Sequence, residues 1–422
     1  MKNNRHQTAT KTFTTVVCIS VILTTCTQIA TANAFRNPPG SASALALDGA
    51  KSVMVDDISS LSVNPANLTK TDKPTALVSF TFINAESTFI SPLGFDADTR
   101  DSLKTLPNIY IATPLKGDTI VAGLGITTPY GQSVEWAKES GLPYFTEMIL
   151  IDIAPTLAIK MSDSLSLGAG LDFYSSQLQT KQVVPWDMVT GNPGAPSGSS
   201  NLKGEGMDVG GTIGLSWDVT ENHHLAAVYH SAFDIVYEGD TRVNNIPAPL
   251  APFISAKTDF ESEIKFPAIA SIGYALDLSE TLTIGTEVEW IEFSRFNSLP
   301  IDTGANNSLG MFPTEIPQKW DDIWTYGLSA AWQYSDSIVL RGSYKYLESP
   351  IPDTTMAPSL PDNDKHTLGI GLGWKGEHQG IDVAYTYSFI DDREINSNQN
   401  PFYVGEYEMD SNIFSIAYIC SL

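Results

Sequence analysis

Hydrophobic and polar residues alternate along most of the chain beyond residue 75, as they do in β-strands with two unlike faces. One face of the segment 281–290 carries Leu282, Ile284, Val288 and Trp290, and the other carries Thr283, Gly285, Glu287 and Glu289. The same alternation recurs in 338–346 and 381–389, and one face of 365–374 is almost entirely glycine. The pattern therefore predicts an all-β fold.

About fourteen segments show this alternation, with boundaries that are uncertain by a few residues. They lie near 75–89, 106–115, 118–128, 145–160, 164–180, 206–218, 222–240, 258–276, 280–297, 320–334, 337–348, 364–375, 379–391 and 407–420. Short polar turns alternate with long loops near 90–105, 129–144, 181–205, 241–257, 298–319, 349–363 and 392–406. One rim of short turns, one rim of long loops and an even strand number are typical of bacterial outer-membrane barrels. The sequence predicts a transmembrane antiparallel β-barrel of about 14 strands in residues 75–422.

Aromatic residues gather toward the ends of these segments, as the interfacial girdles of a membrane barrel require. They include Trp217, Tyr229, Tyr237, Trp290, Phe293, Trp324, Tyr326, Trp332 and Trp374. The alternative is a soluble β-sandwich with these aromatic residues in its core. Such a sandwich would not regularly pair short turns with long loops.

Residues 1–34 have the features of a signal peptide. Lys2, Arg5 and Lys11 form a basic start, an apolar run follows, and Ala32-Asn33-Ala34 forms a cleavage site of small residues. The apolar run is too short and too often interrupted by threonine for the alternative, a transmembrane helix. We therefore expect export by a cleaved N-terminal signal.

The chain is strongly acidic, with a formal net charge of −24. Three basic and no acidic residues lie in the predicted signal peptide, so its removal would change this charge to −27. Such an excess disfavours nucleic acid and anionic lipid surfaces as electrostatic partners. Only Cys420 of the three cysteines would remain, so we expect no intrachain disulfide.

Residues 35–74 lack the strand pattern. Leu47, Met54, Ile58 and Leu61 recur at helix-like spacing, which predicts short helical pieces that end near Asn64-Pro65, because proline lacks the amide donor. The lumen of a barrel of about fourteen strands would otherwise be open to water. We therefore expect residues 35–74 to form a hatch that plugs the lumen.

Several stretches, in order along the chain, carry a likeness to a known family. They are GSASALALDGAKSVMVDDISSLSVNPANL, PNIYIATPLKGDTIVAGLGITTPYG, KWDDIWTYGLSAAWQYSDSIVLRGSYKYLESPIPDTTMAPSLPDNDKHTLGIGLGW and IDVAYTYSFIDDREIN. Together they resemble the FadL-type (OMPP1/FadL/TodX) outer-membrane transporters of long-chain fatty acids and other hydrophobic compounds. The likeness covers almost the whole mature chain and departs at Leu422, where such barrels usually have an aromatic residue.

The resemblance implies an outer-membrane protein through which long-chain fatty acids or similar hydrophobic molecules diffuse passively. It implies that the ligand enters an apolar groove among the extracellular loops and moves to a tighter pocket near the hatch. From there the ligand would leave laterally into the outer-membrane lipid through a break in the third strand. It implies no cofactor, and nothing in the sequence demands more than a monomer. Monoaromatic hydrocarbons fit the same description, and the sequence does not separate the two substrate classes.

Two groups of residues are candidates for the hatch and its gate. Pro129 cannot donate to a strand ladder and Gly131 tolerates unusual dihedral angles, so a strand break near them is plausible, with simple strand termination as the alternative. Asn64, Pro65 and Ala66 are expected to fix the path of the hatch. We expect these three residues to position the gate rather than to contact the ligand.

Two long loops carry apolar residues, which are costly to leave in water and often mark a binding surface. We expect a ligand groove formed by Trp186, Met188, Leu250, Phe253 and Ile254. The alternative is that these loops fold over the barrel mouth and bury each other.

Arg341 and Lys345 lie on the face opposite the apolar side of their strand, so we expect them to point into the lumen. There they are candidates to hold a carboxylate headgroup. They could instead pair with inward acids such as Glu287, Glu289 and Asp382.

Other functional classes have less support in the sequence. No Ser/His/Asp constellation and no metal-ligand cluster stands out, so we expect neither an enzyme nor a metal site. A cation-preferring general porin is the main rival, because the lumen would be acidic. The expected hatch and the apolar loops argue against it, because a porin needs an open aqueous path.

Overall fold

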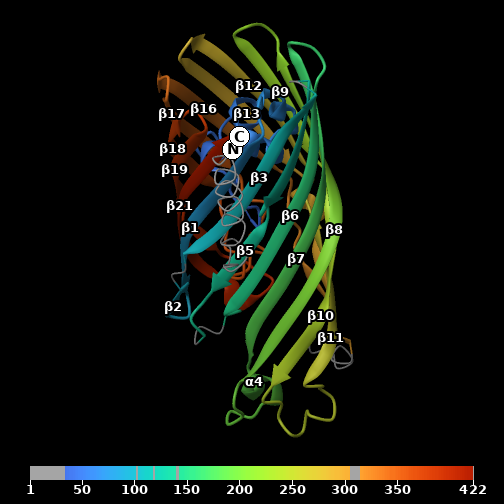
Figure 1. The fold of residues 1–422 in the computed structure, drawn as a ribbon. Coiled ribbons are helices and arrows are strands. Elements are labelled where there is room, and N and C mark those ends of the chain that lie inside the picture. The colour runs from blue at the N-terminus through green and yellow to red at the C-terminus, as the bar shows by residue number, and fades with distance from the viewer. Residues whose placement is uncertain (1–33, 101–102, 117–118, 139–141, 305–313, 422) are drawn as a thin grey trace, which may run out of the picture.

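The strands of the chain form one closed antiparallel sheet that crosses between two rims fourteen times (Figure 1). This computed structural model describes residues 34–100, 103–116, 119–138, 142–304 and 314–421, so the predicted signal peptide lies outside it except for Ala34. The sheet closes where the first strand pairs with the last, from Thr75 opposite Ser421 to Ile90 opposite Glu406. The predicted all-β barrel of about fourteen strands is confirmed.

Most crossings consist of one strand: β1 (Thr75–Ser91), β3 (Lys104–Lys116), β6 (Phe145–Lys160), β7 (Leu165–Val184), β8 (Gly198–Asp218), β13 (Leu282–Ile291), β16 (Ile323–Ser335), β17 (Ile338–Leu347), β18 (Lys365–Lys375), β19 (Gln379–Ile390) and β21 (Gly405–Ser421). The others are divided into β4 (Ile120–Thr127) and β5 (Gly131–Glu135), β9 (His223–His230) and β10 (Phe233–Asn244), and β11 (Lys257–Phe266) and β12 (Ile269–Ser279). Short elements at the long-loop rim are β2 (Phe95–Asp98), α4 (Trp186–Thr190), η5 (Phe293–Arg295), β14 (Ser298–Asp302), β15 (Glu315–Pro317), β20 (Arg393–Ile395) and η7 (Pro401–Tyr403).

The hairpin of β7 and β8 is longer than the sequence predicts. The predicted loop 181–205 is wrong at both ends, because ladder pairs continue to Val184 opposite Gly198. In Figure 1 this hairpin, with α4 at its tip, and the neighbouring hairpin of β10 and β11 reach beyond the rest of the barrel. Ladder hydrogen bonds use backbone N–H and C=O groups that every residue except proline carries, so the ladder continues after the hydrophobic alternation has stopped. The predicted single strands 222–240 and 258–276 are likewise each divided, the second at Pro267, which lacks an amide donor.

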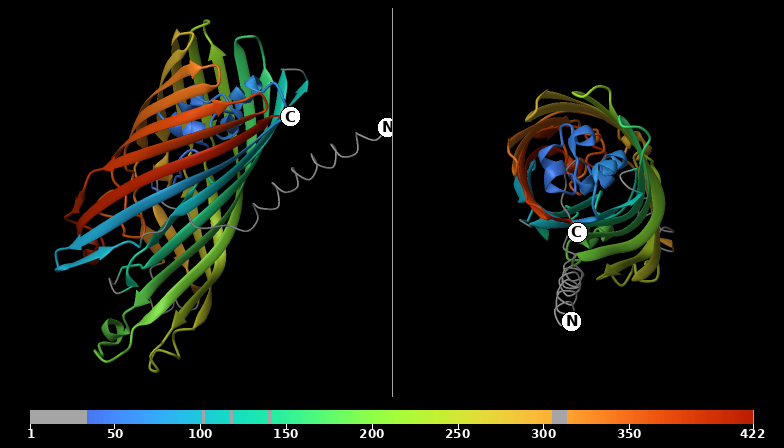
Figure 2. Two further views of the ribbon diagram at one scale, coloured as in Figure 1. Left: turned by 60° about the vertical axis from the view of Figure 1, so that its left-hand side comes forward. Right: turned by 45° about the horizontal axis from the view of Figure 1, so that its top comes forward.

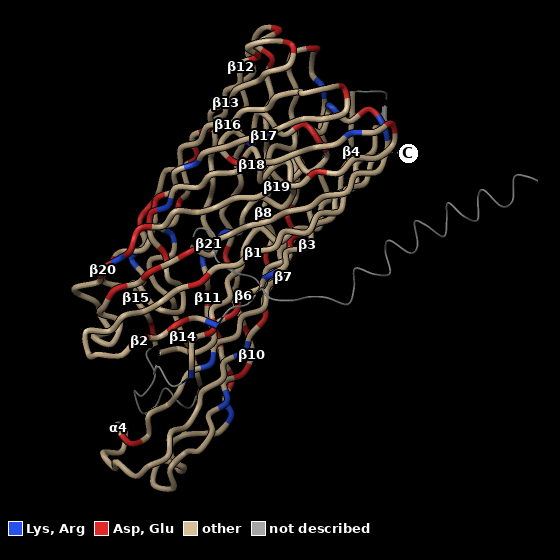
Figure 3. Tube along the Cα trace, turned by 90° about the vertical axis from the view of Figure 1, so that its left-hand side faces the viewer, with Lys and Arg blue, Asp and Glu red and all other residues tan. Residues whose placement is uncertain are grey.

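The outer surface carries an uncharged, apolar band. Large apolar side chains point outward from neighbouring strands, as Ile272 and Ile370 do with exposed fractions of 66% each. Figure 3 shows the charged residues gathered toward the two ends of the wall. An apolar outer band between polar rims is the surface that a hydrocarbon layer covers. None of the helices in the described residues is both long enough and apolar enough to span a membrane.

The N-terminal segment, residues 35–74, lies inside the barrel (Figure 2). It contains α2 (Ala42–Ala46), α3 (Lys51–Met54), η2 (Ile58–Ser62) and η3 (Pro65–Lys70). The side chains of Ser41, Asp57 and Asn64 accept hydrogen bonds from backbone N–H groups at the starts of α2, η2 and η3. The expectation that the helical pieces end near Pro65 is wrong. Pro65 instead opens η3, because a proline is tolerated in the first turn, where its missing N–H would have no intrahelical partner.

Glycines on the inner face of the barrel allow the N-terminal segment to pack directly on the strands. A Cβ at Gly327 would lie 2.4 Å from the Cα of Gly49, and one at Gly168 would lie 2.3 Å from the backbone of Pro65. A Cβ at Gly371 would lie 2.5 Å from Ala46, which explains the glycine-rich face of β18. The inner wall is therefore shaped for this segment.

Candidate functional site

The third crossing of the barrel is broken between β4 and β5, and the start of the N-terminal segment fills the break. Arg36 pairs with Tyr130 as an isolated antiparallel bridge. The N–H of Asn37 donates to the carbonyl of Pro129 at 2.9 Å, and the N–H of Gly131 donates to the carbonyl of Phe35 at 2.8 Å. Residues 35–37 thus supply the strand edge that Pro129, lacking an N–H, cannot continue.

The barrel wall is weakly joined beside this break. In the described chain β3 pairs with β4 from Ile109 onward, and no ladder joins β3 to β5. The side-chain oxygen of Asn108 accepts the N–H of Thr128 at 3.1 Å in place of a ladder bond. A cavity of about 120 Å³ lies immediately inside this part of the wall, and its lining includes Arg36, Asn108 and Lys345.

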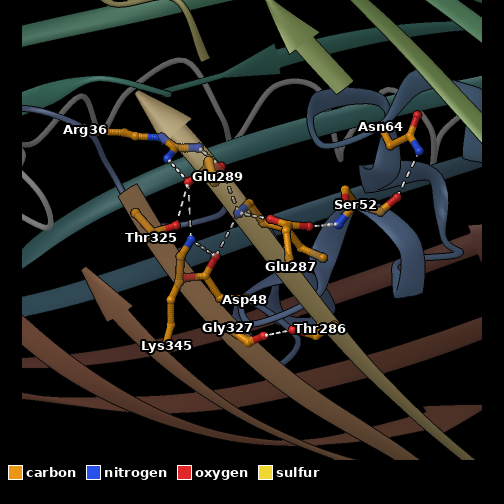
Figure 4. Close-up of polar contacts among 11 residues, drawn as sticks. Arg36, Asp48, Ser52, Asn64, Thr286, Glu287, Glu289, Thr325, Gly327 and Lys345 are labelled. Carbon is orange, nitrogen blue, oxygen red and sulfur yellow. Dashed lines mark hydrogen bonds and ion pairs between the residues drawn. The ribbon is translucent and has the colours of Figure 1, made fainter. Parts of the chain in front are cut away.

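Six charged side chains meet between the N-terminal segment and the wall, and we call them the buried charge cluster (Figure 4). They are Arg36, Asp48 and Lys51 from the segment, Glu287 and Glu289 from β13, and Lys345 from β17. Three positive and three negative charges balance. The cluster ties residues that are more than two hundred positions apart in the sequence.

Glu289 is the centre of the buried charge cluster. Its carboxylate accepts hydrogen bonds from Arg36 at 2.6 and 3.0 Å and from Lys51 at 3.2 Å, and it lies 3.5 Å from the ammonium of Lys345. Glu287 accepts from the ammonium of Lys51 at 2.8 Å and from the N–H of Ser52 at 2.7 Å. Since the side chains of both glutamates are only 2% exposed, each carboxylate depends on these partners for its charge compensation.

The pKa values of Asp48 and Lys51 are shifted in the directions that keep both groups ionised. Burial alone would raise the pKa of Asp48, but Lys345 and Lys51 lower it below its ordinary value. Burial alone would lower the pKa of Lys51, but Glu287, Glu289 and Asp48 raise it well above the ordinary lysine value. Both groups therefore keep their charges through the neutral range.

The Asn-Pro-Ala turn, Asn64 to Ala66, packs against the inner face of the wall near the rim of short turns. Asn64 donates from its amide to the carbonyl of Ser52 at 2.9 Å and to that of Leu215, on β8, at 3.2 Å. Pro65 and Ala66 pack against the backbone of Gly168. These contacts fix the path of the chain. None of the three residues lines the 120 Å³ cavity beside residues 35–37.

A larger cavity of about 330 Å³ lies on the long-loop side of Phe35, and we call it the apolar cavity. Strands β6, β7, β8, β10 and β11 form its wall, and loops close it. Its lining includes Phe35, Met148, Leu178, Leu202, Phe260, Ile264, Phe296, Leu299, Ile301, Trp320, Ile351 and Leu360. Its size and apolar lining are those of a site for a small hydrophobic ligand.

Phe35 forms the floor of the apolar cavity and is held by other rings. Its ring stacks on Trp320 with centroids 5.2 Å apart and meets Phe266 edge-on at 5.2 Å. Phe293 and Phe296 add edge contacts at 5.6 and 5.8 Å. Because Phe35 and Arg36 are consecutive, one short stretch both floors the apolar cavity and fills the strand break.

The loop of residues 348–364, which we call the roof loop, covers the apolar cavity. Arg393 holds it from β20, donating to the carbonyls of Asp362 and Ile351 at 2.7 and 2.5 Å and pairing with Asp353 at 2.7 Å. From the β5 side, the indole N–H of Trp136 donates to the carbonyl of Pro358 at 2.8 Å. The roof loop is therefore hydrogen-bonded to both sides of the mouth.

We expect Arg393→Ala to loosen the roof loop and to weaken ligand binding about tenfold, since hydrogen bonds to a charged group contribute about 1.5–3 kcal/mol. Displacement of a hydrophobic fluorescent probe from the purified barrel would measure this. Arg242→Ala is the control, because Arg242 pairs with Asp240 on an exposed surface. Equal affinities for the two variants would contradict a structural role for Arg393.

The predicted groove residues lie at the tips of two neighbouring hairpins, Trp186 and Met188 between β7 and β8 and Leu250, Phe253 and Ile254 between β10 and β11, and none of them lines the apolar cavity. Trp186 and Ile254 are buried in a small separate cluster with Val184 and Val243, and Leu250 packs against it. Met188 and Phe253 are exposed. The two loops therefore bury part of their apolar surface against each other and leave part of it exposed.

Both candidate headgroup residues form ion pairs. Arg341 pairs with Asp382 at 2.5 Å beside a polar cavity at the short-turn mouth. Lys345 belongs to the buried charge cluster and lines the 120 Å³ cavity inside the strand break. Of the two, only Lys345 lies near residues 35–37.

Sequence reasoning missed Phe35, Arg36, Asp48 and Lys51. For the three charged residues a partial signal was available, because they stand in a segment rich in small and apolar residues, and for Phe35 there was none. For metals, the described residues bring together one group of three suitable side chains, Asp392, Glu406 and Glu408. These carboxylates are all exposed, and exposed acidic groups are common without an ion.

A closed barrel with an apolar outer band, a lumen that contains the N-terminal segment and a cavity with an apolar lining defines an outer-membrane transporter of hydrophobic molecules. Residues 23–421 match the family model of the outer membrane protein transport proteins (OMPP1/FadL/TodX). The chain belongs to this family, which places it in the outer membrane of Gram-negative bacteria.

Individual relatives support the assignment. A long-chain fatty acid transport protein of Escherichia coli O6:H1 is 24% identical over 368 residues, covering 79% of this chain and 81% of the relative. That of Salmonella typhi is 21% identical, covering 83% and 85%. The crystal structure of a Pseudomonas aeruginosa FadL homologue superposes with a TM-score of 0.80 at 19% identity, covering 92% of this chain and 99% of the other. The crystal structure of the Pseudomonas putida toluene transporter TodX superposes with a TM-score of 0.71 at 15% identity, covering 92% of this chain and 99% of the other.

Proposed function

We propose that this protein lets hydrophobic molecules, long-chain fatty acids or similar compounds, diffuse passively across the outer membrane through a gate formed by the N-terminal segment. The supporting observation is that residues 35–37 fill the break in the third crossing and that the first of them, Phe35, also floors the apolar cavity. A ligand in the apolar cavity touches the same stretch that closes the wall. Withdrawal of this stretch would open a path from the cavity to the membrane.

Lateral exit suits the chemistry of the substrate. The lumen on the short-turn side is filled by the N-terminal segment, and the cavity at that mouth is lined by charged residues such as Asp57, Lys70 and Asp382. An apolar molecule that crossed it would lose about 0.8 kcal/mol for each methylene returned to water. The weakly joined wall between β3 and β5 offers a shorter path into lipid.

Two rival functions have less support. A general porin needs an open aqueous path, and here the lumen contains the N-terminal segment with its balanced ion cluster. Catalysis has no residue constellation in its favour, and we propose that the protein is not an enzyme. Monoaromatic hydrocarbons remain a substrate alternative, supported by the shared fold of the toluene transporter.

A disulfide across the strand break tests the gate. Asn37 and Pro129 are opposite each other in the short ladder, so Asn37→Cys/Pro129→Cys places two thiols within bonding range. In a Cys420→Ser background, we expect the oxidised variant to lose uptake of oleate and toluene, and reductant to restore it. The single-cysteine variants are the controls. Full uptake by a quantitatively oxidised protein would contradict the proposed gate.

A further inference from the structure

The wall of the apolar cavity offers uncharged polar groups and no ionised ones. None of its lining residues in the described chain is Lys, Arg, His, Asp or Glu. Hydroxyl and amide side chains lie between the apolar ones in this lining, among them those of Gln132, Thr146, Thr180, Thr241 and Gln318. A ligand held here meets hydrophobic surface and neutral hydrogen-bonding groups.

Two of these hydroxyls are buried without a hydrogen-bond partner. Thr146 on β6 is 5% exposed and Thr241 on β10 is 1% exposed, and neither side-chain oxygen forms a hydrogen bond. They lie on one level of the wall, because Thr146 pairs with Thr180, Thr180 with Leu202, and Leu202 with Thr241. A buried polar group is expected to find a partner. The side chains of Thr146 and Thr241 line the cavity, so a rotation about χ1 that turns the hydroxyl toward a bound ligand would let a ligand oxygen provide one.

Among the residues that the structure describes, the buried charge cluster and the Arg341–Asp382 pair leave no surplus positive charge for an anionic ligand. The buried charge cluster balances three cations with three carboxylates, and Arg341 is paired with Asp382. Asp152 and Asp172, on β6 and β7, are also buried, and within the described residues neither forms an ion pair. A carboxylate that entered would lose its hydration without gaining a counter-charge.

We propose that the apolar cavity takes neutral molecules, with a long apolar portion and one uncharged oxygen such as that of an alcohol, aldehyde or ester, in preference to carboxylates. The oxygen accepts a hydrogen bond from the hydroxyl of Thr146 or Thr241. This inference rests on the proposed function and narrows its substrate class. A fatty acid would then bind in its protonated form.

Competition between matched ligands tests the proposal. The neutral dye N-phenylnaphthylamine is bound to the purified full-length barrel and displaced by decanol or by decanoate, which share one alkyl chain length. At roughly pH 8, where a carboxylic acid is ionised, we expect decanol to compete at least about tenfold better. The apparent affinity for decanoate should fall about tenfold per pH unit above its own pKa, in proportion to the neutral fraction.

Variants locate the effect in the cavity. Thr146→Val/Thr241→Val keeps the side-chain shape and removes both hydroxyls. The affinity for decanol should therefore fall about fivefold, while the affinity for the hydrocarbon decane should be unchanged. Thr180→Lys should raise the affinity for decanoate at the same pH, because it adds a positive charge to the cavity wall. Thr180→Gln, which adds length without charge, should leave that affinity unchanged. Circular dichroism and gel migration would confirm that each variant is folded.

Three results would each overturn a different part of the proposal. Equal affinity for decanol and decanoate at every pH would overturn the preference for neutral ligands while leaving transport intact. An unchanged decanol affinity in the double valine variant would overturn the role of the hydroxyls. Failure of all three ligands to displace the dye, together with no uptake by cells, would overturn the transport function and this inference with it.

Discussion

Glu289→Ala is expected to release the N-terminal segment from the lumen and to turn the barrel into a leaky channel. The substitution removes the carboxylate that Arg36, Lys51 and Lys345 share, in a site where its side chain is 2% exposed. Removing one member of a buried ion pair costs about 3–5 kcal/mol, because the remaining charge is left uncompensated. We expect a lower unfolding temperature and ion conductance in planar bilayers well above that of the wild type.

Two further variants show whether charge balance is the cause. Arg36→Leu/Glu289→Leu removes one charge of each sign and leaves Lys51 and Lys345 with Asp48 and Glu287, so it should recover part of the lost stability. Glu135→Ala removes a partner of exposed Arg100 and should cost less than about 1 kcal/mol. Wild-type conductance and stability in Glu289→Ala would refute the role of the cluster.

Gly327→Val is expected to expel the N-terminal segment by steric exclusion alone. A Cβ at Gly327 would lie 2.4 Å from the Cα of Gly49 and 2.5 Å from its carbonyl oxygen. Both contacts are with backbone, so rotation of a side chain cannot relieve them. We expect a cost of about 3 kcal/mol or more to the packed state, and cleavage of the segment by trypsin at Lys51.

Gly342→Val is the matched control, because a Cβ there meets its nearest atom, the carbonyl oxygen of Gly369, at 3.8 Å. Valine favours strands, so both variants should still close the barrel, and heat-modifiable migration in gels checks this. Equal protection of Lys51 in the two variants would show that the segment does not need the glycine at 327.

Features encoded by neighbouring residues were predictable from the sequence, and contacts between residues distant in the sequence were not. The strand pattern, the number of crossings and the unlike character of residues 35–74 are local features, and all are visible in the order of residues. The glycine face of 365–374 was also visible, but only the structure showed that the N-terminal segment packs against it. The apolar cavity was not visible, because its lining comes from many separate strands and loops, whereas Trp186 and Ile254, which the sequence singled out, pack with each other where two hairpin tips meet.

The sequence by itself determined a β-barrel of about fourteen strands, because alternation with a period of two follows from strand geometry within each segment. Only the tertiary structure decided which charges meet and where the wall opens. Arg36 reaches Glu289 across 253 positions, and residues 35–37 reach the break at Pro129, only after the barrel has closed around the N-terminal segment. Such contacts depend on register and on the path of the chain through the lumen, which no local pattern encodes.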